Sequence, residues 1–301
     1  MEQDRTVGLK EPQRHFLWRL PLRLLEALLY SSVFISACAF GLTVETQLLA
    51  GLPVSLPMAA FVFLSTLFTY NVSSIKSLLL RPGQKPDRRS AAWSQRNKRF
   101  LAALGIASLA GAVALYLSYG FRVNIWFVLH LALISVGYTV PVIYKARQVR
   151  PLRSMPLLKV FLIAYVWAMV TALLPLIDAG LAVWEPQALQ ILGRRFLFIL
   201  ALALLFDIRD YAYDKATNTL TFPGLVGVKN TKLLSLGLLV LYVLTALQTE
   251  VGAVQLALVG SAVGASLVVL FSSDERPRIY YAILADGAML LHAGLVYLAF
   301  S

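Results

Sequence analysis

The chain has 301 residues, of which 59% are hydrophobic and only 14% are charged. This apolar fraction lies above the roughly 45–50% of soluble globular domains and excludes an ordinary soluble fold. The formal net charge is +12, and Cys38 is the single cysteine, so neither a disulfide within the chain nor a cysteine-based metal site can form.

The apolar residues occur in long blocks with few charges, which is typical of transmembrane helices. Blocks of about 18–22 residues match the roughly 30 Å hydrocarbon core of a bilayer. Backbone groups in lipid must bond within helices, so the sequence predicts an all-α, polytopic helical bundle that forms a single domain over residues 1–301. Nine transmembrane helices are expected, at residues 20–42, 53–71, 100–119, 123–144, 157–177, 187–207, 233–249, 251–271 and 278–300.

The basic residues give an independent test of this topology. With the N-terminal segment 1–19 in the cytoplasm, 24 of the 27 Lys and Arg residues lie on the cytoplasmic side, leaving Arg122, Arg194 and Arg195 outside. The positive-inside rule therefore favours nine spans, with the N-terminus in the cytoplasm and the C-terminus outside. A bacterial inner membrane is the expected location. Topology and anionic membrane lipid explain the net charge, so no nucleic-acid partner is expected.

Two cytoplasmic cap loops, 72–99 and 208–232, are long and polar, whereas outward loops such as 43–52 are short. The two long loops follow the second and the sixth span. Matching loop positions in two parts of a chain suggest an internal repeat, with a shared site where the loops meet.

The second cap loop begins with three aspartates, in LLFDIRDYAYDKATN (residues 204–218). If the helix of the sixth span continues past the membrane edge, the i, i+3 and i+7 spacing places Asp207, Asp210 and Asp214 on one face. We call these three residues the aspartate ladder. Like charges repel, so a cation is expected, and Mg²⁺ is the obvious candidate because carboxylates, waters and substrate phosphates usually hold it. Arg209 and Lys215 could neutralise the ladder instead.

The segment DIRDYAYDKATNTLTFPGLVG (residues 207–227) resembles the second aspartate motif of the UbiA superfamily of intramembrane prenyltransferases. After the three aspartates, Thr221, Pro223 and Gly227 also match the motif. The resemblance implies helices around a central cavity that is open to lipid and capped by the two cytoplasmic loops. It also implies that the ladder binds Mg²⁺ and a prenyl diphosphate, whose isoprenoid chain passes to a hydrophobic acceptor.

The first aspartate motif of that family, expected after the second span, is degenerate in this chain. In YNVSSIKSLLL (residues 70–80), Asn71 is kept, but Ile75 and Leu79 stand where the family has aspartates. Either one Mg²⁺ suffices, with Lys76 or Arg88 supplying the missing positive charge, or the chemistry has been lost. The sequence leaves both alternatives open.

The segment 137–159 resembles the family's connection between the fourth and fifth spans, where a tyrosine and basic residues approach the diphosphate. Tyr138 and Lys145 are the best positional matches, with Lys159 behind them, although positive-inside anchoring also explains the charges. Asp286, deep in the last span, is expected to line the cavity. No catalytic residue is assigned; the residues expected to bind substrate are Asn71, Lys76, Arg88, Tyr138, Lys145, Lys159, Arg209, Lys215 and Asp286.

The other ionisable residues within the predicted spans are expected mainly to have structural roles. His130 and His292 are expected to hydrogen-bond across helices. Arg194 and Arg195 either snorkel outward, or Asp207 is recessed below the membrane surface.

Three functions remain in view. The first is a Mg²⁺-dependent prenyltransferase. The second is a non-catalytic relative that binds a prenyl diphosphate or supports a partner enzyme, favoured by the loss of the first motif. The third, a transporter, leaves the motif in residues 207–227 unexplained. The alcohol phosphotransferases also cluster aspartates, but they need a D-G-x-x-A-R segment that is absent here.

Overall fold

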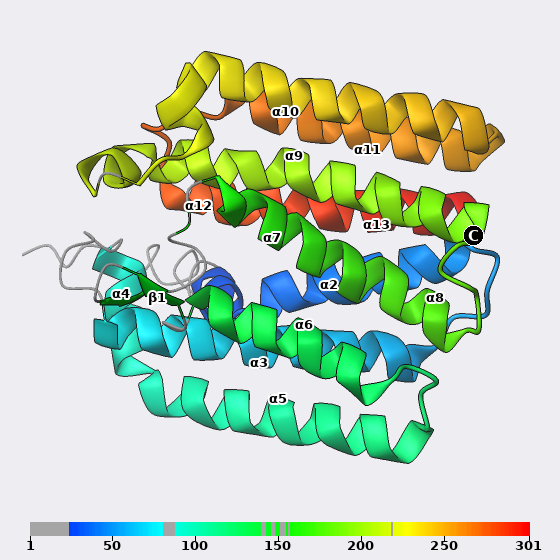
Figure 1. Cartoon of the computed structure of the whole chain (residues 1–301), viewed down its shortest axis with the longest axis horizontal. Coiled ribbons are helices and arrows are strands. Elements are labelled where there is room, and N and C mark those ends of the chain that lie inside the picture. Colours follow the sequence, from blue (N-terminus) through cyan, green and yellow to red (C-terminus); the bar gives the residue numbers. More distant parts are fainter. Residues whose placement is uncertain are drawn as a thin grey trace, which may run out of the picture.

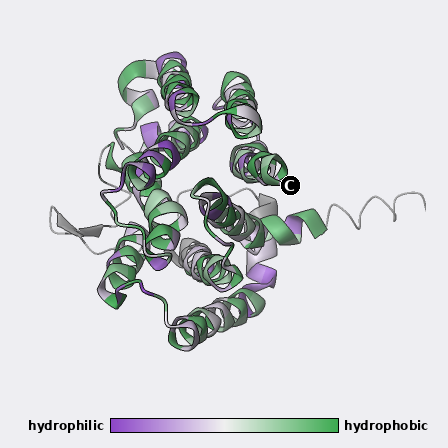
Figure 2. Cartoon of the chain, turned by 90° about the vertical axis from the view of Figure 1, so that its right-hand side faces the viewer, coloured by the Kyte–Doolittle hydropathy of each residue, from purple (hydrophilic) through white to green (hydrophobic). Residues whose placement is uncertain are grey.

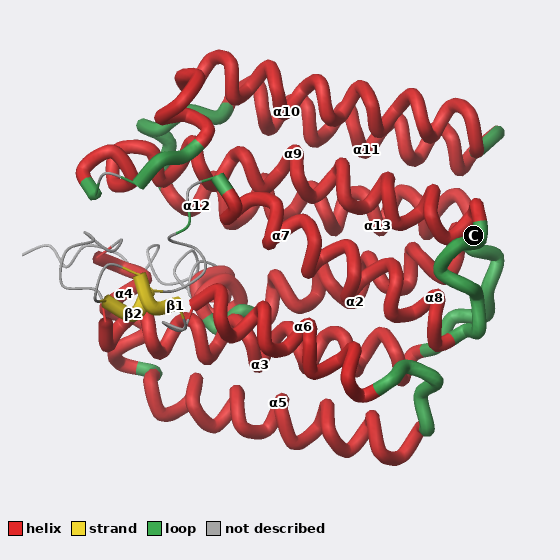
Figure 3. Tube along the Cα trace, viewed as in Figure 1, coloured by secondary structure: helices red, strands yellow, loops and turns green. Residues whose placement is uncertain are grey.

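The computed structural model describes residues 24–80, 88–139, 143–145, 148–150, 155, 157–217 and 219–301. In this part of the chain, long helices run side by side along one axis of the molecule (Figure 1). The loops gather at the two ends of the bundle, as the tube view shows (Figure 3). The predicted helical class is confirmed, with a short β-hairpin in addition.

Each predicted span overlaps a helical stretch of the described chain. The stretches α7–η2–α8 and α12–η3–α13 each run on as one helix, over Leu158–Asp178 and Arg278–Phe300, with a π-helical turn inside. In chain order, the elements after a short helix Leu24–Tyr30 are α2 (Val33–Leu49), α3 (Leu56–Leu80), α4 (Arg88–Arg96), α5 (Lys98–Tyr119), α6 (Ile125–Thr139), β1 (Ile143–Lys145), β2 (Gln148–Arg150), α7 (Leu158–Ala168), η2 (Met169–Leu173), α8 (Leu174–Asp178), α9 (Pro186–Ala216), α10 (Phe222–Thr249), α11 (Gly252–Phe271), α12 (Arg278–Tyr280), η3 (Tyr281–Ala285) and α13 (Asp286–Phe300).

The bundle has the length and the surface of a membrane protein. Five helices in the described residues are long and apolar enough to cross a membrane, or six if the bent pair Leu24–Tyr30 and α2 counts as one span. Large apolar side chains point outward, among them Leu117, Trp126 and Val251, which are 74–83% exposed. Hydrophobic residues dominate the helices in the hydropathy view (Figure 2). Because water does not tolerate so large an apolar surface, the chain is an integral membrane protein.

The predicted outward loop 43–52 is wrong over most of its length, because α2 continues to Leu49. Its polar residues suggested a loop, yet Glu45 is only 1% exposed and its neighbours Thr46 and Gln47 are buried as well. The helix is instead interrupted earlier, at Ser32, whose φ is 66°. There the short helix Leu24–Tyr30 and α2 meet at an angle of 69°.

The cap loops 72–99 and 208–232 are largely helical, which corrects the prediction of loops. α3 continues to Leu80, α4 follows from Arg88, and α9 continues to Ala216. Residues 208–217 contain neither glycine nor proline, so nothing in that sequence ends the helix at the membrane edge. Gly227 has φ 83° inside α10, a conformation that favours glycine, and this explains the glycine of the motif.

The connection between α6 and α7 contains the only strands in the described residues. α6 was expected to reach residue 144 but ends at Thr139, and β1 then pairs antiparallel with β2, with Ile143 opposite Arg150. Pro141 disfavours helix both at its own position and at the residue before it. Valine, isoleucine and tyrosine then favour extended chain.

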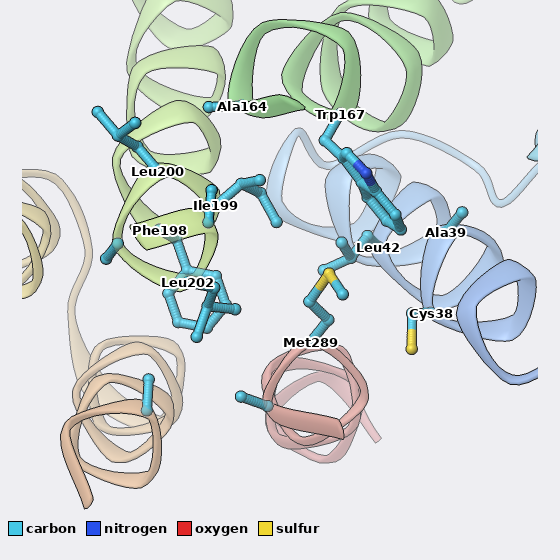
Figure 4. Close-up of a cluster of buried hydrophobic side chains, with 14 of the residues drawn as sticks. Cys38, Ala39, Leu42, Ala164, Trp167, Phe198, Ile199, Leu200, Leu202 and Met289 are labelled. Atoms are coloured by element: carbon cyan, nitrogen blue, oxygen red, sulfur yellow. The ribbon is translucent and has the colours of Figure 1, made fainter. Parts of the chain in front are cut away.

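The core lies between α2, α7, α9 and α13, and its side chains point toward one another (Figure 4). Leu42, Trp167 and Met289 meet there, and Cys38 is fully buried. Every residue of α9 from 198 to 205 is buried, so this helix is surrounded by other helices. α9 therefore holds the aspartate ladder at one end of a rigid central helix.

Candidate functional site

The aspartate ladder lies on one unbroken helix. Because α9 continues from Pro186 to Ala216, Asp207, Asp210 and Asp214 share a helix face, as the spacing predicted. Asp207 is 1% exposed and Asp214 is 6% exposed, whereas Asp210 is partly buried. Such buried carboxylates require cationic partners.

Lys159, in the first turn of α7, is the cation that contacts two of the three aspartates of the ladder. Its Nζ lies 2.6 Å from Asp207 Oδ1 and 3.3 Å from Asp214 Oδ2. The lysine side chain is 14% exposed, so the contact is largely shielded from solvent. Two carboxylates that are seven residues apart thus converge on one positive charge.

The start of α7 is held against the segment that follows the ladder. The Leu157 N–H donates to the Leu220 carbonyl over 3.3 Å, and Phe161 and Phe222 pack with their ring centroids 6.1 Å apart. Leu157 has φ 59°, a conformation that non-glycine residues adopt rarely. These contacts set the backbone position of Lys159 opposite the ladder.

Asp210 is held by arginines instead. Arg209 donates from Nε and Nη2 to the two carboxylate oxygens over 3.0 and 2.8 Å, and its guanidinium lies over the Phe206 ring. Arg278, from α12, places Nη2 3.6 Å from Asp210 Oδ1. The three carboxylates of the ladder therefore meet three cations, and the ladder with these contacts is electrically neutral.

Buried oxygens without hydrogen-bond partners coincide with motif positions. Within the described residues, Asn71 Oδ1 and Thr221 Oγ1 are buried and have no hydrogen-bond partner. Buried polar atoms of this kind are costly unless a ligand, ion or water satisfies them.

The remaining predicted residues divide into three groups. Tyr138 and Asp286 lie within electrostatic range of the ladder, because the charges of Asp207 and Arg209 act on Tyr138 and the charge of Arg209 acts on Asp286. The Asn71 amide instead donates to the Leu67 and Ser31 carbonyls, which ties α3 to the interruption before α2.

Of the other predicted cations, the structure describes only the side chain of Lys215. Lys215 is exposed and forms no ion pair with any described residue. The side chains of Lys76, Arg88 and Lys145 lie outside the described part of the structure, as does the segment 1–23.

The donor set fits a magnesium ion held by two carboxylates. No three His, Cys, Asp or Glu side chains converge in the described residues, because Arg209 and Arg278 hold Asp210. Asp207 and Asp214 do converge, on the Lys159 ammonium. One or two carboxylates, with waters and substrate phosphates, form the usual environment of protein-bound Mg²⁺.

Sequence reasoning missed one residue of this site, Arg278, and a second polar cluster. It ranked Lys159 behind Lys145 and did not select Arg278. A lone lysine at the start of an apolar span was the available signal, because such a charge needs a partner.

The second cluster lies around Arg195, on α9 far from the ladder. Its Nη2 contacts Glu45 Oε2 at 2.7 Å, and Glu45 Oε1 lies 3.0 Å from His292 Nε2. His292 Nδ1 lies 2.9 Å from Ser261 Oγ, which confirms the predicted structural role of this histidine. Arg195 is 2% exposed, so it is paired inside the protein and does not snorkel outward. The network joins α2, α9, α11 and α13.

Comparison with known proteins gives matches in structure alone. No protein-family model matches the chain, and no curated protein matches its sequence. A solved structure of digeranylgeranylglyceryl phosphate synthase is similar with a TM-score of 0.54 and 17% identity, over 92% of this chain and 96% of that one.

Two structures of a UbiA homologue from Archaeoglobus fulgidus, one bound to GPP and Mg²⁺ and one to DMAPP and Mg²⁺, are also similar. Their TM-scores are 0.58 and 0.57, at 14% and 13% identity, over 92% of this chain and 98% of each of those. These likenesses extend over almost the whole chain, and they agree with the motif in residues 207–227. The chain therefore has the fold of the UbiA homologues.

Proposed function

We propose that the chain is a UbiA-superfamily prenyltransferase, which transfers an isoprenoid chain from a prenyl diphosphate to a lipid-soluble acceptor with the help of Mg²⁺. The convergence of Asp207 and Asp214 on one cation, at the end of the central helix, carries this proposal. The unsatisfied hydroxyl of Thr221 supports it, since Thr221 is a motif residue. GPP, DMAPP and Mg²⁺ in the similar structures belong to the same ligand class.

The residues of the site divide the work of binding and charge stabilisation. Asp207 and Asp214 would hold Mg²⁺, which supplies positive charge to a departing diphosphate. Arg209 and Arg278 would face the diphosphate oxygens while they keep Asp210 in place. The bond between the allylic carbon and the diphosphate oxygen breaks, a nucleophilic atom of the acceptor bonds to that carbon, and this atom gives up its proton to the released diphosphate. Apolar side chains of the neighbouring helices keep water from the allylic cation.

We also propose how the chain crosses the membrane. Residues 1–301 form a single domain with nine crossings around a central cavity that is open to lipid. The N-terminus lies in the cytoplasm of a bacterial inner membrane and the C-terminus lies outside, as the positive-inside rule favours. The ladder end of α9 then faces the cytoplasm, together with α4 and the hairpin, which lie at the same end of the bundle (Figure 1).

One observation favours a second function. Ile75 and Leu79 replace the aspartates of the first motif, so a second metal has no carboxylates at these positions. A relative that binds prenyl diphosphate without transferring the chain, or that supports a partner enzyme, would need only the half of the site that is present.

A transfer assay tests both functions. Purified full-length protein in lipid nanodiscs receives radiolabelled prenyl diphosphate, Mg²⁺ and a panel of lipid-soluble acceptors. The first function predicts release of diphosphate and a labelled lipid product, and Asp207→Asn abolishes both. Binding of the diphosphate without turnover on a broad panel favours the second function. If the protein neither binds the prenyl diphosphate nor turns it over, both functions are refuted.

A further inference from the structure

Lys159 occupies the position that a metal ion would take in the ladder. Its ammonium contacts Asp207 and Asp214 at 2.6 and 3.3 Å, and these carboxylates are only 2% and 9% exposed as side chains. Mg²⁺ needs oxygen ligands at about 2.0–2.1 Å and would use the same lone pairs. An ammonium and a divalent ion also repel each other strongly in so poorly solvated a place.

We propose that Lys159 and a divalent metal ion compete for this place, so that metal binding releases Lys159 toward the diphosphate. The inference rests on the proposed function, because it assumes that the metal and the diphosphate share this site. Lys159 acts as a built-in cation that keeps Asp207 and Asp214 together while no metal is bound. Its flexible four-carbon stem allows the ammonium to leave while the backbone stays in place.

The charge of the site changes with this exchange. With Lys159, Arg209 and Arg278 in contact, the three carboxylates of the ladder are neutralised. A divalent ion between Asp207 and Asp214 leaves the same groups with a charge of about +2, because the released ammonium stays nearby. The neutral site does not attract a multiply charged diphosphate, whereas the metal-loaded site does. Metal and diphosphate therefore bind with positive cooperativity.

The neighbouring contacts limit where the released ammonium can go. Leu157 is bonded to Leu220, so the first turn of α7 remains beside the ladder. Asp210 keeps its two arginines and offers no open place to another cation. The ammonium thus stays at the edge of the site, where diphosphate oxygens are expected.

Metal titration of the protein without substrate tests the competition. Full-length protein in detergent is stripped with EDTA and titrated with Mn²⁺, and bound metal is followed by electron paramagnetic resonance. If Lys159 fills the place for 90–99% of the time, Lys159→Gln binds Mn²⁺ about 10- to 100-fold more tightly than the wild type. Lys229→Gln, an exposed lysine on α10, leaves the affinity unchanged. Equal or weaker Mn²⁺ binding by Lys159→Gln overturns the proposal.

A measurement on the wild-type protein covers the case in which the Lys159→Gln variant does not fold. The amine of Lys159 is labelled with a small acylating reagent and quantified by mass spectrometry, with and without Mg²⁺. Release of the ammonium predicts faster labelling of Lys159 in Mg²⁺ and an unchanged rate at Lys229. An unchanged rate at Lys159 contradicts the exchange.

The two proposals can fail separately. Tighter Mn²⁺ binding by Lys159→Gln without transfer on any acceptor leaves the exchange standing and refutes the enzyme. Transfer by the wild type with no gain in Mn²⁺ affinity in Lys159→Gln refutes the exchange alone.

Discussion

Replacing Arg195 by methionine should strongly destabilise the bundle, although Arg195 lies far along α9 from the ladder. Arg195 donates to the Leu42 carbonyl from both terminal nitrogens at 3.2 Å, to Thr171 Oγ1 at 2.7 Å and to Thr46 Oγ1 at 3.1 Å. Its ion pair with Glu45 is 2.7 Å long, and both side chains are 1% exposed. Methionine fills similar space but satisfies none of these acceptors.

The magnitude follows from what remains buried after the change. Glu45 keeps only its contact with His292, so a carboxylate with half of its partners stays in the core. Breaking one side of such a buried pair costs about 3–5 kcal/mol in free energy of unfolding. The neighbouring pair of Arg194 with Glu250 is a matched control, because Glu250 is 21% exposed and can be solvated. Arg194→Met should cost only about 1 kcal/mol.

Equilibrium unfolding of the purified protein in mixed micelles, followed by circular dichroism, gives these free energies. The double variant Glu45→Met with Arg195→Met should be more stable than Arg195→Met alone, because it leaves no buried charge without its partner. The reasoning is refuted if Arg195→Met lies within about 1 kcal/mol of the wild type. It is refuted equally if Arg194→Met costs as much as Arg195→Met.

Three further outcomes are expected. Asp207→Asn should weaken Mn²⁺ binding by more than about 100-fold, whereas Asp210→Asn should weaken it by less than about tenfold because arginines hold Asp210. Similar losses of Mn²⁺ affinity for the two variants in a metal titration would count against the two-carboxylate site. Chelation with EDTA should reduce binding of radiolabelled prenyl diphosphate to background, because the ladder with its cations is neutral, and undiminished retention on a filter would contradict this. Ser32→Gly should raise the free energy of unfolding by about 0.5–1 kcal/mol because Ser32 has φ 66°, and Ser32→Val should lower it. If unfolding in mixed micelles gives the opposite order of stability, the backbone at Ser32 is not strained.

The membrane class and the arrangement of the ladder could be predicted from the sequence. Apolar length and absence of charge are local properties, and they place a helix in lipid whatever its neighbours are. The i, i+3 and i+7 spacing puts Asp207, Asp210 and Asp214 on one face of any continuous helix.

The helix ends were less predictable, because polar residues do not reveal whether a distant partner exists. The segment from Thr43 to Gln47 has the composition of an outward loop. It is helical and buried because Glu45 meets Arg195 and His292, which are 150 and 247 positions away in the chain. Such burial is favourable only once these partners are in place.

The choice of cation at the ladder also depended on the tertiary structure. Lys145 precedes the helix Leu158–Asp178 and Lys159 lies in its first turn, and the sequence ranked Lys145 first. Packing of α7 on α9, with the Leu157–Leu220 bond at its start, puts Lys159 between Asp207 and Asp214. The sequence alone determined that three carboxylates lie on one face of a membrane helix. Only packing between helices decided which cation meets each carboxylate, because an ion pair depends on distances between side chains that are far apart in the chain.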